Sequence, residues 1–146
     1  MVRKIALLLV VMLSFCCVFS FAAPASILPD NAVSTSSDLL TVTNPTSEAI
    51  SSYDKTHNIS GYAASGVELS IYYLNNGTYY PLYKDGEPIV FSVGASGMFI
   101  KPVSLSNGKN DLLVRAELNG KVQYTKKTIN VLSFNLFNLF KGFNLF

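Results

Sequence analysis

Between Asp38 and Val131, apolar residues alternate with polar residues in short runs separated by turn residues. Alternation with a period of two is typical of half-buried strands, and no stretch repeats apolar residues at the spacing of a helix. The pattern predicts strands at residues 39–43, 58–63, 67–74, 78–84, 88–93, 98–105, 111–118 and 122–131. Strands this short and this regularly spaced predict an all-β, antiparallel two-sheet sandwich of seven to eight strands.

Asn-Gly dipeptides are typical of the tight turns that join adjacent antiparallel strands. Asn76-Gly77 and Asn119-Gly120 accept the two positive φ angles of a type I′ turn, so each predicts a hairpin. With a two-residue loop at Asn76-Gly77, Leu74 faces Tyr79 across the first hairpin. We expect the core side of this hairpin to carry Val67, Leu69, Ile71, Tyr73, Tyr80 and Leu82.

The opposite side of this hairpin is the main candidate binding surface. It carries Tyr72, Leu74, Tyr79 and Tyr83, which we name the tyrosine strip. An exposed aromatic strip stacks on sugar rings or anchors a protein partner, because tyrosine has a flat apolar body and a polar tip. Cross-strand aromatic pairs also stabilise a hairpin without binding a ligand, and this alternative stays open.

Two sequence features predict irregular strands. The apolar positions of residues 122–131 change from even numbers in the first half to odd numbers in the second. One regular strand cannot point both sets inward, so we expect a bulge or bend near Lys126. Pro102 has no N–H to donate to a neighbouring strand, so we expect residues 98–105 to form an edge strand or to be interrupted there.

Residues 1–25 have the layout of a secretory signal peptide. Arg3 and Lys4 precede the apolar run at residues 5–21, and small residues follow it. Cleavage after Ala22 and cleavage after Ala25 both satisfy the preference for small residues, and the sequence does not choose between them. An uncleaved membrane anchor is the alternative.

In each case the domain leaves the cytosol, so we expect a secreted protein, extracellular or associated with the cell envelope. A lipoprotein signal at Cys16 is less favoured, because the bulky Phe15 stands where a small residue is needed. Residues 26–37 are rich in Ser, Pro and small residues, which predicts a flexible linker. The folded domain is therefore expected to span residues 38–131.

The composition excludes several kinds of chemistry. Beyond Arg3 and Lys4 the chain carries nine basic and nine acidic residues. A domain without net positive charge does not attract the phosphate backbone, so we expect no nucleic-acid partner. Both cysteines lie in the leader, so we expect no disulfide, cysteine-ligated metal or thiol catalysis in the mature domain. His57 is the single histidine and has no nucleophile motif beside it. We therefore expect no catalytic residue, no metal site and no cofactor.

Two segments resemble bacterial immunoglobulin-like domains of the type found as accessory domains beside glucodextranase catalytic domains. One is Gly97-Met98-Phe99 with the later Leu105-Ser106-Asn107-Gly108-Lys109-Asn110, and the other is Ile59-Ser60-Gly61-Tyr62-Ala63 before Gly66-Val67. The similarity covers about residues 44–131 and departs from the family at residues 94–96. It implies an immunoglobulin-like sandwich that occurs as a module of secreted proteins and carries no catalytic residues. It also implies that Asn110 bridges backbone groups of a loop.

The C-terminal tail, residues 132–146, repeats in threes. Its aromatic residues are Phe134, Phe137, Phe140, Phe143 and Phe146. A spacing of three fits neither a strand nor a clean apolar helix stripe. Contact with a membrane surface, docking on the sandwich or on a partner, aggregation and a repeat without a role all remain open.

These features predict a secreted bacterial immunoglobulin-like module without enzymatic activity. It acts in binding, or as a structural protein of the cell envelope or extracellular space, with an unidentified protein or glycan as partner. The alternatives are a carbohydrate-binding module that uses Tyr72, Tyr79 and Tyr83, and an accessory domain of an extracellular hydrolase system.

Overall fold

Residues 23–133 are described by the computed structural model, and they form an all-β fold. Their helical content is one short 3-10 turn, η1 (Pro29–Asn31). No helix between residues 23 and 133 has the length and apolar character needed to cross a bilayer. Most of the predicted leader and the phenylalanines of the tail lie outside the described residues.

The strands of the described part are β1 (Leu40–Asn44), β2 (Ala49–Ser52), β3 (Thr56–Ala63), β4 (Glu68–Asn75), β5 (Thr78–Pro81), β6 (Tyr83–Lys84), β7 (Glu87–Pro88), β8 (Val90–Ser92), β9 (Met98–Ser104), β10 (Gly108–Leu118) and β11 (Lys121–Val131). Each predicted strand corresponds to at least one of them. The predicted segment 78–84 is divided between β5 and β6, and β2 is a strand that the pattern did not predict.

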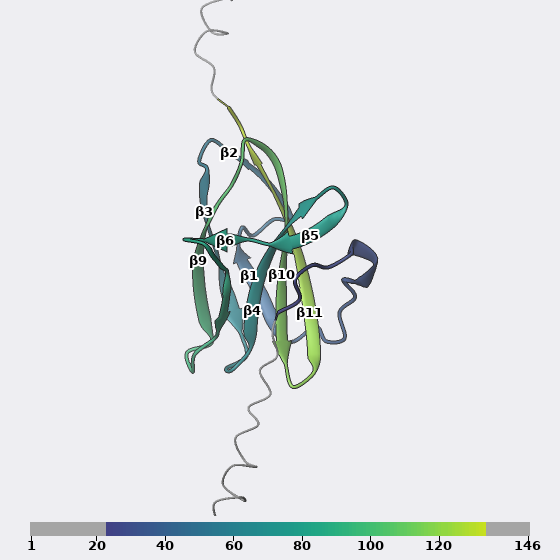
Figure 1. The fold of residues 1–146 in the computed structure, drawn as a ribbon. Coiled ribbons are helices and arrows are strands. Elements are labelled where there is room, and N and C mark those ends of the chain that lie inside the picture. The colour runs from purple at the N-terminus through teal and green to yellow at the C-terminus, as the bar shows by residue number, and fades with distance from the viewer. Residues whose placement is uncertain (1–22, 134–146) are drawn as a thin grey trace, which may run out of the picture.

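Two sheets pack face to face (Figure 1). The three-stranded sheet has the order β1-β3-β9, and the six-stranded sheet has the order β2-β11-β10-β4-β5, with β8 also paired to β4. β6 and β7 form a separate small hairpin between β5 and β8. β2 runs parallel to β11, while the other pairings of the described strands are antiparallel. The prediction of an all-β fold with antiparallel sheets is confirmed.

Both predicted hairpins are present. β4 and β5 pair with Leu74 opposite Tyr79 and Tyr73 opposite Tyr80, and β10 and β11 pair around Asn119-Gly120. Asn76 and Gly77 have φ angles of 46° and 78°, as the type I′ turn requires. The register of each hairpin is therefore set locally, by its turn.

The main core lies between the two sheets. Its buried members include Leu40, Ile59, Phe99 and Val103 from the three-stranded sheet and Leu69, Ile71, Leu112, Val114, Ala116, Ile129 and Val131 from the six-stranded sheet. The expectation that Tyr73 and Tyr80 also lie in this core is wrong. Both are exposed, with ring centroids 6.4 Å apart, because the tip of the β4–β5 hairpin projects beyond the core (Figure 1).

The predicted bulge near Lys126 is absent. β11 pairs with β10 residue by residue from Lys121 to Val131, without a shift in register. The apolar positions change phase because both faces of β11 are covered: Ile129 and Val131 belong to the core, whereas Tyr124 packs in a second cluster on the outer face. A register shift occurs instead on β1, between Val42 and Asn44.

The edge position of Pro102 is confirmed, because Pro102 lies in β9 at the edge of the three-stranded sheet.

Residues 26–37, which the sequence predicts to be a flexible linker, pack against the fold. This part of the chain is in contact with the outer face of the six-stranded sheet, where Ile27 is 5% exposed. Burial of the Ile27 side chain and hydrogen bonds to β5 and β11 hold it there.

Candidate functional site

The tyrosine strip is mostly buried. Tyr72 is 0% exposed, Tyr79 is also buried, Leu74 is half-buried, and Tyr83 alone of the four is exposed. Tyr72 and Tyr79 form a second apolar cluster with Ile27 and Leu113 on the outer face of the six-stranded sheet. The strip is therefore not the continuous exposed surface that the alternation predicted.

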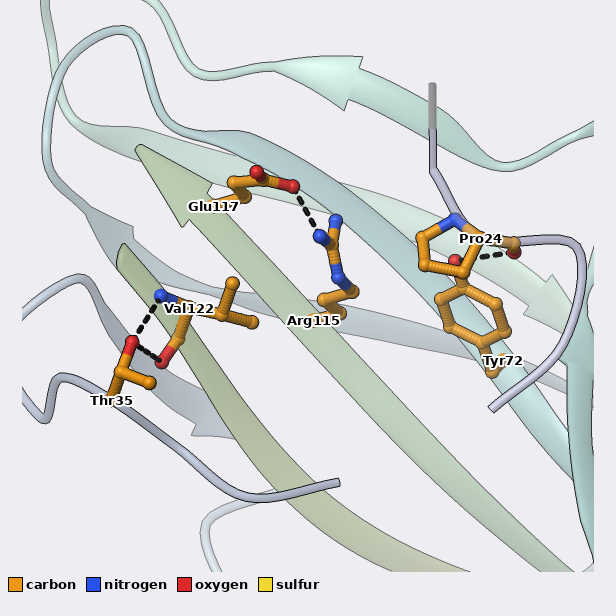
Figure 2. Close-up of polar contacts among 6 residues, drawn as sticks. All are labelled: Pro24, Thr35, Tyr72, Arg115, Glu117 and Val122. Atoms are coloured by element: carbon orange, nitrogen blue, oxygen red, sulfur yellow. Dashed lines mark hydrogen bonds and ion pairs between the residues drawn. The ribbon is translucent and has the colours of Figure 1, made fainter. Parts of the chain in front are cut away.

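The N-terminal segment, which we define as residues 23–36, covers this cluster. Ile27 N–H donates to the Tyr79 carbonyl over 2.9 Å, and Tyr79 N–H donates to the Ile27 carbonyl over 2.8 Å. The Tyr72 hydroxyl donates to the Pro24 carbonyl over 2.9 Å (Figure 2). Burial raises the pKa of the Tyr72 hydroxyl and that of the Tyr79 hydroxyl.

The same segment also reaches the β11 side of the sheet. Thr35 N–H and Ser36 N–H donate to the Val122 carbonyl. Val122 N–H donates to Thr35 Oγ1 over 2.8 Å (Figure 2). Tyr124 N–H donates to Ser34 Oγ over 2.9 Å. The N-terminal segment therefore crosses the outer face from β5 to β11 (Figure 1).

A polar cluster, Glu68, Ser70, Arg115 and Glu117, lies on this outer face, on β4 and β10. Arg115 forms an ion pair with Glu117 (Figure 2). Burial alone would lower the pKa of the Arg115 guanidinium, but Glu117 and Tyr124 beside it raise the pKa overall. Arg115 and Ser70 also form side-chain hydrogen bonds with Tyr124 and Tyr72, respectively. Glu68 Oε1 is buried without a hydrogen-bond partner among residues 23–133.

Asp111 forms a second polar contact on β10. Lys109 Nζ lies 2.8 Å from Asp111 Oδ2, and the Thr128 hydroxyl donates to Asp111 Oδ1 over 2.6 Å. Burial raises the pKa of this carboxyl, but the hydrogen bonds from Lys109 and Thr128 and the charge of Lys109 bring it below the usual value.

The outer face of the three-stranded sheet carries exposed apolar side chains, whereas that of the six-stranded sheet is covered by the N-terminal segment. Tyr62, Met98 and Ile100 are 54%, 62% and 63% exposed. Tyr62 is the direct cross-strand partner of Met98, and Ile100 is two residues further along β9. These three side chains, which we name the open face, line a shallow hollow together with Thr43, Ser60, Gly61 and Phe99. Among residues 23–133, no charged residue lines this hollow.

The open face was missed because strands 58–63 and 98–105 were interpreted from alternation alone. The consecutive apolar residues Met98, Phe99 and Ile100 are a signal that could have found it. Successive strand residues point to opposite faces, so three in a row place apolar side chains on both faces. Phe99 is buried in the core, and its two neighbours are exposed.

The remaining candidates occupy structural positions. His57 lies in β3, and its Nε2 is 3.0 Å from the Asp54 carbonyl oxygen. Asn110 bridges loop backbone groups, accepting from Ser106 N–H and donating to the Ser106 and Gly108 carbonyls. Residues 23–133 contain no cluster of three or more His, Cys, Asp or Glu side chains that could hold a metal.

The tail residues proposed for membrane or partner contact, Phe134, Phe137, Phe140, Phe143 and Phe146, lie outside the described residues. A comparison with protein-family models finds no match, and a comparison with curated proteins finds no similar sequence.

Proposed function

We propose that the protein is an exported, non-catalytic β-sandwich module of the immunoglobulin-like type, and that it binds another protein through the open face. The export proposal is supported by the basic, apolar and small-residue order of residues 1–25. The immunoglobulin-like proposal is supported by the two packed sheets and by the residues that resemble that family.

The binding proposal depends on one observation, the unequal cover of the two outer faces. The chain uses its own N-terminal segment to cover the six-stranded sheet, where Tyr72 and Tyr79 would otherwise be exposed. On the other sheet Tyr62, Met98 and Ile100 stay exposed side by side. Contiguous exposed apolar side chains are typical of interaction sites.

The chemistry of the open face favours a protein partner over a glycan. Met98 and Ile100 are aliphatic and offer no hydrogen-bond donor to a sugar hydroxyl, whereas methionine and tyrosine are enriched at protein interfaces. The lining is uncharged, so a complementary partner presents an uncharged apolar surface. The tyrosines that favoured a glycan are largely buried.

Site-specific photo-crosslinking in the producing cell tests this function. The chain carries its own leader, and benzoylphenylalanine replaces Tyr62 in one variant and Val33 in the control. Val33 is 67% exposed but lies on the N-terminal segment, away from the open face. We expect a protein adduct of defined mass in the exported fraction at position 62 and none at position 33.

The other outcomes overturn the proposal in distinct ways. An adduct of twice the chain mass at position 62 identifies a second copy instead of a different partner. Equal adducts at both positions, or no adduct at position 62, contradict the open face as a binding site. Full-length chain confined to the cytosol contradicts export.

A further inference from the structure

We propose that the mature chain begins at Ala23, and that the new α-ammonium group supplies a cation to the polar cluster on the outer face. This inference rests on the proposed export, because cleavage of the leader creates the ammonium group. The sequence permits cleavage after Ala22 or after Ala25, and the contacts of the N-terminal segment distinguish the two positions.

Cleavage after Ala25 removes a residue that the fold uses. Pro24 accepts the hydrogen bond of the Tyr72 hydroxyl over 2.9 Å. Without Pro24 this buried hydroxyl loses its acceptor, and a buried donor without a partner destabilises the folded state. Cleavage after Ala25 also places the new charge at Ser26, next to the buried side chain of Ile27. Cleavage after Ala22 leaves both contacts intact.

Ala23 shares a hollow with one member of the polar cluster, Ser70. Ala23, Pro24, Ser70 and Tyr72 line one hollow of about 290 Å³ between the N-terminal segment and the edge of the sheet. Ser70 is buried, and its hydroxyl forms a side-chain hydrogen bond with the Tyr72 hydroxyl. Glu68 is two residues away on the same face of β4, and its Oε1 is buried without a hydrogen-bond partner among the described residues.

The charges of the cluster call for a second cation. Glu68 and Glu117 are direct cross-strand partners on β4 and β10, and like charges directly opposite each other are destabilising. The guanidinium of Arg115 forms an ion pair with Glu117. An ammonium group carries one positive charge and three donors. At Ala23 it can donate to Glu68 Oε1, an acceptor on β4 that has no hydrogen-bond partner among residues 23–133.

Intact-mass measurement of the exported protein tests the cleavage position. The chain is expressed with its own leader in a bacterial host and recovered from the exported fraction. We expect a mass that corresponds to a start at Ala23. A start at Ser26 or at Cys16 in the exported chain overturns this inference and leaves the export proposal standing. An unprocessed cytosolic chain contradicts export itself.

NMR titration of the N-terminal amine tests its contact with the cluster. The purified chain that begins at Ala23 is reductively methylated with ¹³C, which keeps the charge on the amine. We expect the pKa of this amine to exceed the usual upper value of about 8, because a nearby carboxylate favours the charged form. Glu68→Gln should bring the pKa back to the usual range.

Glu48→Gln is the control, because Glu48 is exposed and precedes β2, outside the cluster. This variant should leave the pKa of the amine unchanged. An amine pKa that is ordinary in the unsubstituted chain, or that responds equally to Glu68→Gln and Glu48→Gln, refutes the contact. The titration is made on folded protein, so a change in stability alone does not produce the expected pattern.

Discussion

Replacing Ile27 by alanine should destabilise the protein by about 2 kcal/mol. Ile27 is buried against Tyr72, Tyr79 and Leu113, and the substitution removes three carbon atoms, each worth about 0.8 kcal/mol of burial. Buried isoleucine-to-alanine substitutions range from about 2 to 5 kcal/mol. The lower end applies because one segment covers this site and can settle into the space left behind.

Thermal unfolding followed by circular dichroism measures this effect on the chain that begins at Ala23. For a domain of this size, 1 kcal/mol corresponds to about 4 °C in Tm, so Ile27→Ala should lower Tm by about 8 °C. Val33→Ala is the matched control, because Val33 lies on the same segment and is exposed. Its effect should stay within about 0.5 kcal/mol. Equal Tm values for the two variants would refute the packing of the N-terminal segment.

Three further predictions concern Gly61 in β3, the carboxyl group of Asp111 on β10, and the tail. Gly61→Ala should destabilise the fold by about 3 kcal/mol or more, measured by urea denaturation, because an added Cβ would lie 2.0 Å from the Thr41 carbonyl oxygen. Gly94→Ala is the control, because its added Cβ meets no atom within 4 Å, and it should leave the urea midpoint unchanged. Asp111→Asn should lower Tm at pH 7 but not at pH 2, because a carboxyl with a lowered pKa stabilises the fold above its unfolded pKa and loses this contribution as pH falls through the folded pKa. If the tail binds membranes, deletion of residues 132–146 should abolish flotation of the protein with liposomes.

Each of these predictions has a contradicting result. Equal urea midpoints for the two glycine variants would show that the backbone of β1 yields at Thr41. A difference between Asp111→Asn and the unsubstituted protein that stays constant from pH 7 to pH 2 would show that ionisation of Asp111 is not coupled to folding. Equal flotation with and without residues 132–146 would end the membrane prediction for the tail.

The hairpins were predictable because short-range chemistry sets them. Asn76-Gly77 and Asn119-Gly120 take positive φ angles at both positions, and the alternation of the flanking residues then follows the turn. The core positions Val67, Leu69 and Ile71 follow from the same register. These features require no information from distant parts of the chain.

The cover of the outer face was not predictable by the same route. A single buried apolar residue, Ile27, in a Ser- and Pro-rich segment gives no periodic signal, and its partner Tyr79 is 52 positions further along the chain. Alternation alone therefore places the tyrosine strip in solvent. It also predicts a bulge in β11, because it allows for one covered face, whereas the packing of Tyr124 shows that both faces of β11 are covered.

Hydrogen–deuterium exchange, measured amide by amide on the chain that begins at Ala23, tests most directly whether residues 23–36 cover the six-stranded sheet. The amides of Ile27, Thr35 and Ser36 donate to carbonyls of β5 and β11, so they should exchange far more slowly than in an unfolded peptide. Exchange of all three at unfolded-peptide rates, while the amides of β4 and β10 remain protected, would contradict the account.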